Sequence, residues 1–96
     1  MIKRENAKDG KVKLTFVQKY AESAPVYVLG DFNHWSPTTN KLVKRTNGTA
    51  SATITVDANQ KVRFRYRNSD GVWFNDEAAD AYEQGEAGAP NSIVNV

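Results

Sequence analysis

Two tryptophans are the residues of this chain best suited to contact a ligand, because both stand beside turn-forming residues. Trp35 precedes a Ser-Pro pair, and Trp73 follows shortly after an Asp-Gly pair. A tryptophan in so small a chain usually belongs to the core. Two of them near turns with polar neighbours indicate an exposed aromatic surface instead. Such rings stack on the apolar faces of pyranose sugars, and they can equally stack on nucleic-acid bases.

A row of basic residues lies between the two tryptophans in the sequence. Three arginines alternate there with apolar residues: Arg63, Arg65 and Arg67. Alternate residues of a strand share one face, so the three guanidinium groups are expected side by side. Such a row favours binding of a polyanion. A solvated basic face whose aliphatic stems cover the sheet is the alternative.

The sequence offers little for catalysis. His34 is the only histidine and cysteine is absent, so any nucleophilic triad would have to be built around His34. His34 and Asp31 would give a metal two ligands, fewer than a site needs. Five acids could supply a carboxylate pair for glycoside hydrolysis, but we expect them in a solvated loop: Asp76, Glu77, Asp80, Glu83 and Glu86. We predict that the protein is not an enzyme and uses no metal or cofactor.

Charge is divided unevenly along the 96 residues. Residues 1–67 hold all 13 lysines and arginines, whereas residues 68–96 hold six of the 11 acidic residues and no base. The acidic segment is expected to fold back on the basic one, although a polyanion-binding body with an acidic tail has the same pattern. No secretory signal and no run of about 20 apolar residues is visible, so we expect a cytoplasmic protein that does not enter a membrane.

Period-two patterns dominate the elements that must position these residues. Alternating apolar residues in 12–16 and 62–66 predict half-buried strands, and residues 41–46 and 50–56 predict a hairpin around an Asn-Gly turn. With short strands near 26–29, 72–74 and 92–96, about seven strands are expected. This rhythm favours an all-β, immunoglobulin-like antiparallel sandwich, with a closed five-stranded barrel as the alternative.

The length fits one domain, residues 1–96, in which residues 1–9 could form an N-terminal arm. The acidic stretch at 77–82 is expected to be a loop with at most one helical turn, because it is short and precedes a Gly-rich run.

Three motifs in order resemble carbohydrate-binding module family 48, the isoamylase N-terminal or early set domain. That module also forms the glycogen-binding part of the AMP-activated protein kinase β subunit. The first motif is Val-Tyr-Val-Leu-Gly-Asp-Phe-Asn-His-Trp at 26–35. The second is Phe-Arg-Tyr at 64–66 followed by Asp-Gly-Val-Trp at 70–73, and the third is Asn-Ser-Ile-Val-Asn-Val at 91–96. Together they cover roughly residues 10–96.

The resemblance implies an early set module that binds α-1,4-linked glucans such as glycogen, starch or maltooligosaccharides. If the 96 residues are the whole protein, we expect a stand-alone module, because a (β/α)₈ barrel would need about 250 residues. It implies that Trp35 and Trp73 stack on glucose rings and that Arg65 and Asn91 hydrogen-bond sugar hydroxyls. The family commonly has lysine where this chain has Arg65, which keeps the donors and changes their geometry. Glycogen-binding members also carry a large apolar loop residue before the final asparagine, whereas residues 85–90 here are Gly-Glu-Ala-Gly-Ala-Pro.

Two functions therefore stand side by side. The first is non-catalytic binding of α-glucan by Trp35, Arg65, Trp73 and Asn91. The second is a protein-interaction or regulatory module of glycogen metabolism whose sugar site is weakened or lost, with a glycogen-metabolising enzyme as its partner. The Gly-rich run and the arginine row motivate the second function. Nucleic-acid binding is the third and least favoured interpretation.

Overall fold

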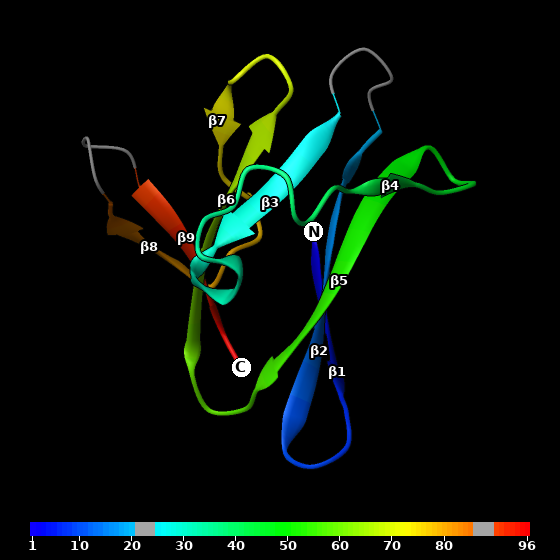
Figure 1. The fold of residues 1–96 in the computed structure, drawn as a ribbon. Coiled ribbons are helices and arrows are strands. Elements are labelled where there is room, and N and C mark those ends of the chain that lie inside the picture. The colour runs from blue at the N-terminus through cyan, green and yellow to red at the C-terminus, as the bar shows by residue number, and fades with distance from the viewer. Residues whose placement is uncertain (21–24, 86–89) are drawn as a thin grey trace.

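The computed structural model describes residues 1–20, 25–85 and 90–96, which form two antiparallel sheets around one core (Figure 1). The first sheet has the strand order β1-β2-β5-β4: β1 (Ile2–Asn6), β2 (Lys11–Lys19), β5 (Thr49–Asp57) and β4 (Val43–Lys44). The second sheet has the order β3-β6-β9-β8, with β7 paired to β6: β3 (Val26–Gly30), β6 (Lys61–Asn68), β9 (Pro90–Asn95), β8 (Ala81–Gln84) and β7 (Trp73–Phe74). The predicted all-β sandwich is confirmed, with nine strands in the described residues rather than about seven.

The core lies between the two sheets and follows the alternation read from the sequence. Apolar side chains of β2 and β6 point inward and are buried: Val12, Leu14, Phe16, Val62, Phe64 and Tyr66. The Phe16 ring lies 4.8 Å from that of Phe64, which joins the two sheets at the centre. Burying such side chains stabilises a fold by about 1.5–3 kcal/mol each, so this aromatic centre is a main source of stability.

The N-terminal residues form a strand and not an arm. Residues 2–6 pair along β2, with Ile2 opposite Phe16 and Asn6 opposite Val12. Ile2 is the only residue of β1 that is even half-buried; the other four are exposed. Charged residues on an edge strand prevent pairing with other chains, and here they also hide the strand from a hydrophobicity pattern.

The acidic stretch is likewise more ordered than expected. Ala81–Gln84 forms the short edge strand β8, which pairs with β9, so the predicted loop is wrong at this point. The predicted return of the acidic segment onto the basic one is confirmed by the ion pairs Arg4–Asp80 and Arg63–Glu83.

The predicted hairpin is present with a shorter first arm. Of the predicted first arm, residues 41–46, only Val43 and Lys44 form strand pairs with β5. The Asn-Gly turn follows at residues 47–48. Residues 40–42 hydrogen-bond to β3 instead: the Leu42 amide donates to the Val26 carbonyl, and the Asn40 carbonyl accepts from the Val28 amide. This segment therefore crosses from one sheet to the other. In the described residues no helix has the length and apolar character that a membrane crossing requires.

Candidate ligand-binding surface

The outer face of β6 carries the three arginines. Val62, Phe64 and Tyr66 are buried, so the alternating positions 63, 65 and 67 point away from the core. The row predicted from the sequence therefore exists. It lies on the outside of the second sheet, between β3 on one edge and β7 and β9 on the other.

Trp35 is held against this face by the loop that begins at the end of β3. Asp31–Asn33 forms a single 3-10 turn, η1, in which the Asn33 side chain accepts from the Gly30 amide and donates to the Val28 carbonyl, both at 3.0 Å. The Trp35 amide closes the loop by donating to the Gly30 carbonyl at 2.8 Å. Phe32 turns inward, with its ring 5.9 Å from that of Phe16. The Gly-Asp-Phe-Asn-His-Trp motif is thus a compact loop anchored in the core.

The backbone at the end of this loop is strained. His34 and Trp35 have φ values of 56° and 57°, in the left-handed region that bulky residues rarely adopt. Each such residue costs about 1–3 kcal/mol and persists only where its surroundings hold it. The strain supports a functional reason for the position of Trp35, because a purely structural loop could place glycine or asparagine there.

Trp73 is presented by a turn at the far end of β6. The Asn68 side chain accepts from the amides of Asp70 and Val72, both at 3.0 Å, and Gly71 has a φ of 82°. The turn brings Trp73 directly opposite Arg67 across the β6–β7 pair. Its side chain remains 45 % exposed, an unusual environment for a tryptophan in a small domain.

Arg65 joins the predicted site residues. Its Cζ lies 5.9 Å from the Trp35 ring centroid and 5.7 Å from that of Trp73, and its Nε donates to Asn91 Oδ1 at 2.7 Å. The structure therefore brings Trp35, Arg65, Trp73 and Asn91 into one cluster, which we call the tryptophan–arginine platform. A carbon atom in van der Waals contact with the centre of a ring would lie about 3.5–4 Å from it. The guanidinium group therefore lies over the two indoles without stacking tightly on either.

The three arginines of the row differ in the contacts that hold them. The Arg63 guanidinium forms ion pairs with Asp31 and Glu83. Arg65 is hydrogen-bonded to the neutral amide of Asn91, and Arg67 lies 5.7 Å from the Trp73 centroid. Arg67 forms no ion pair with any carboxylate of the described residues, so its positive charge lies at the Trp73 end of the platform.

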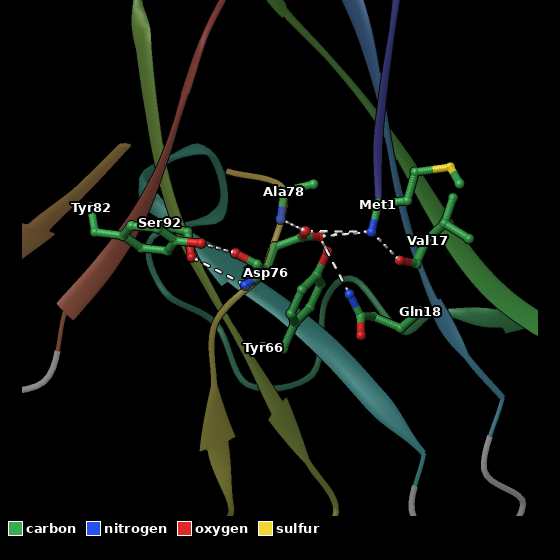
Figure 2. A network of polar contacts seen from close by, with 8 residues as sticks. All are labelled: Met1, Val17, Gln18, Tyr66, Asp76, Ala78, Tyr82 and Ser92. Carbon is green, nitrogen blue, oxygen red and sulfur yellow. Dashed lines mark hydrogen bonds and ion pairs between the residues drawn. The ribbon is translucent and has the colours of Figure 1, made fainter. Parts of the chain in front are cut away.

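Asp76 is a buried charged residue that the sequence did not reveal. It was expected in a solvated loop, but its side chain is 1 % exposed and lies between the two sheets (Figure 2). Its carboxylate accepts hydrogen bonds from four groups: Tyr66 OH at 2.6 Å, Ala78 N at 2.8 Å, Met1 N at 3.2 Å and Gln18 Nε2 at 3.3 Å. Its main chain is held as well, because Tyr82 OH donates to the Asp76 carbonyl.

These contacts give Asp76 a structural role. Burial raises the pKa of Tyr66 well above its usual range, and the hydrogen bond to Asp76 and the negative charge of Asp76 raise it further. Tyr66 therefore stays a neutral donor to the carboxylate. A carboxylate enclosed by four donors offers no access to a ligand, so this network belongs to the scaffold and not to the platform.

Other candidate sites are weaker. Among the described residues, no group of three or more His, Asp and Glu side chains is placed to hold a metal ion. A hollow of about 450 Å³ beside η1 is lined by four charged residues: Lys11, Asp31, Asp57 and Lys61. Three of these charges already form ion pairs, Lys11 with Asp57 and Asp31 with Arg63, which leaves Lys61 as the one lining charge without an ion pair among the described residues. Residues 86–89, which cover most of the Gly-rich run, lie outside the described part of the chain.

Comparison with known proteins adds no identification. No family model matches this chain, and no curated protein matches it.

Proposed function

We propose that the protein is a non-catalytic binding module for α-1,4-linked glucan. The proposal rests on one observation, the convergence of an exposed indole (Trp73) and a half-buried one (Trp35) on a single guanidinium group that is itself positioned by an asparagine. A core built only for stability does not require two tryptophans outside its apolar cluster. The resemblance of the three motifs to a glucan-binding family points to the same ligand.

The chemistry of the platform suits a sugar. Indole faces stack on the apolar C–H faces of glucose rings, while Arg65 offers a fork of donors to hydroxyl groups. Asn91 is buried and its Oδ1 accepts from Arg65 Nε, so its main contribution is to position that fork. The Arg65 guanidinium must move aside or share the indole surface when a ring stacks there. Exposed cation–π contacts are worth about 0.5–1 kcal/mol, so this displacement costs little.

Replacement of Trp73 by alanine is the direct test. Wild-type protein should be retarded in a native gel that contains glycogen, and Trp73→Ala should lose most of that retardation because the more exposed stacking surface is gone. The matched control is Val72→Ala, which removes another exposed apolar side chain from the same turn. This variant should behave like wild type.

Two results would contradict the proposal. Wild-type protein that migrates equally with and without glycogen would favour the protein-interaction alternative. Equal retardation of Trp73→Ala and wild type would show that any glucan binding occurs elsewhere on the molecule.

A further inference from the structure

Arg67 extends the platform at its Trp73 end. It faces Trp73 across the β6–β7 pair, and its Cζ lies 5.7 Å from the indole centroid. A glucose ring on Trp73 would therefore meet the guanidinium group of Arg67 in addition to that of Arg65. Binding a neutral sugar requires stacking and hydroxyl partners, but it does not require this second positive charge.

The charge of Arg67 is not compensated by any carboxylate in the described part of the chain. Arg63 forms ion pairs with Asp31 and Glu83, whereas Arg67 forms none. Asp70 lies in the adjoining turn, and among the described residues no ion pair joins it to Arg67. The guanidinium rests between the Trp73 ring and Gly71, where an added Cβ would come within 3.4 Å of Arg67 Nη2. The absence of a side chain at Gly71 leaves room for it.

We propose that the platform prefers α-glucan carrying a phosphate monoester on or next to the glucose that stacks on Trp73. This inference rests on the proposed function. Hydroxyl groups project outward from the edge of a pyranose ring, and the Arg67 Cζ lies 5.7 Å from the Trp73 centroid, so an ester on a glucose stacked there comes within reach of the Arg67 guanidinium. The planar guanidinium fork matches two phosphate oxygens, and charge-assisted hydrogen bonds are the stronger kind.

The distribution of charge favours a phosphorylated sugar over a nucleic acid. Proteins that bind single-stranded nucleic acids combine stacking aromatic rings with a positively charged groove that follows the nucleic-acid backbone over several phosphates. Here the row is positive at one end, and Asp31 and Glu83 neutralise the other end at Arg63. This arrangement fits one phosphate beside two stacked rings better than a continuous chain of phosphates.

The experiment compares one glucan in two forms. Binding of phosphorylated amylodextrin, and of the same preparation after phosphatase treatment, is measured by isothermal titration calorimetry at low and high ionic strength. Wild-type protein should bind the phosphorylated form about 3- to 10-fold more tightly at low ionic strength, and the ratio should shrink with salt. Arg67→Gln should bring the ratio to about 1, and Arg67→Lys should give an intermediate value. Arg63→Gln, in the same row, should keep the wild-type ratio.

The outcomes separate this inference from the proposed function. Equal binding of both forms by wild type overturns the phosphate preference and leaves glucan binding standing, whereas binding of neither form overturns glucan binding itself. If Arg67→Gln keeps the wild-type ratio of affinities for the two forms, another group binds the phosphate, and the inference is also overturned. Tighter binding of a single-stranded oligonucleotide than of phosphorylated amylodextrin would replace the sugar ligand with a nucleic acid.

Discussion

The carboxylate of Asp76 shows how one residue can connect several strands. Its donors come from β2, β6, the start of the chain and the turn before β8, and its own amide donates to Ser92 of β9 at 3.3 Å. Each hydrogen bond contributes only about 0.5–1.5 kcal/mol net. Loss of a partner for a buried donor costs more, because that donor is left without water.

Asp76→Asn should therefore lower the free energy of unfolding by about 1–3 kcal/mol, because an amide has one acceptor oxygen for four donors. Urea denaturation followed by circular dichroism would measure the change. In a double-mutant cycle with Tyr66→Phe, the losses in the free energy of unfolding caused by the two substitutions should not add, since both variants break the same hydrogen bond. Additive effects, or a loss below 0.5 kcal/mol for Asp76→Asn (a surface-sized change), would contradict this role.

Sequence reasoning succeeded for residues whose neighbours form a pattern and failed for Asp76. Trp35 and Trp73 stand in motifs with turn residues around them, and the strand alternation placed Arg65 on the outer face. Asp76 lies in a run of acids that has no apolar periodicity. Three of its four donors lie 10 to 75 residues away, which no local pattern can reveal.

At the scale of elements, the junction of β3, η1 and β6 holds the platform together. Gly30 has an extended φ of −164°, so its backbone conformation suits any residue. Its requirement is spatial: an added Cβ would lie 2.4 Å from the Arg63 carbonyl oxygen and 2.5 Å from the Phe32 ring. Neither the backbone of β6 nor a ring packed on Phe16 can move aside easily.

Gly30→Ala should destabilise the fold by about 1–3 kcal/mol through overpacking and should weaken glycogen retention, because Gly30 anchors the Trp35 amide. Gly48→Ala is the matched control. It lies in open space at a φ of 77°, so it should cost about 1–2 kcal/mol of backbone strain without affecting retention. Denaturation and native gels on both variants provide the comparison. Unchanged retention by Gly30→Ala would show that the loop tolerates a shift.

The strands that the sequence predicted are the ones that face the core, and those it missed are edges. β2 and β6 bury every second side chain, so their period is visible. β1 and β8 have no fully buried residue, and Ile2 is the single residue of β1 that packs against the core, so neither strand has a periodic hydrophobic signal. The first arm of the hairpin was predicted too long because residues 40–42 hydrogen-bond to the other sheet.

At the scale of the whole molecule, the basic and acidic parts of the chain are tied together across the sandwich. Asp80 accepts from the Asn95 amide at 2.7 Å and forms an ion pair with Arg4 of the other sheet. The Asn95 amide, followed by the Arg4 guanidinium, lowers the pKa of Asp80 below its ordinary value of 3.8.

A lowered pKa in the folded state stabilises the fold when the carboxylate is charged. This contribution is complete above the unfolded pKa of about 3.9 and is lost as the pH falls toward the folded value. Urea midpoints of wild type and Asp80→Asn should therefore differ by a constant amount above about pH 5 and converge below about pH 4. Arg4→Gln should reduce the same difference in part, because the Asn95 amide remains. A difference that does not depend on pH would contradict the role of Asp80.

The placement of the two tryptophans also determines which part of the protein is observed by intrinsic fluorescence. They are the only indoles in the chain, and both border Arg65 on the outer face, while the core contains phenylalanine and tyrosine. Intrinsic emission excited at the red edge of absorption therefore arises entirely from the platform. This emission will respond to a displacement of the 31–40 loop or to a bound ligand, and it can change while both sheets are still folded. Loss of the fold must instead be followed through the amide signal of the strands.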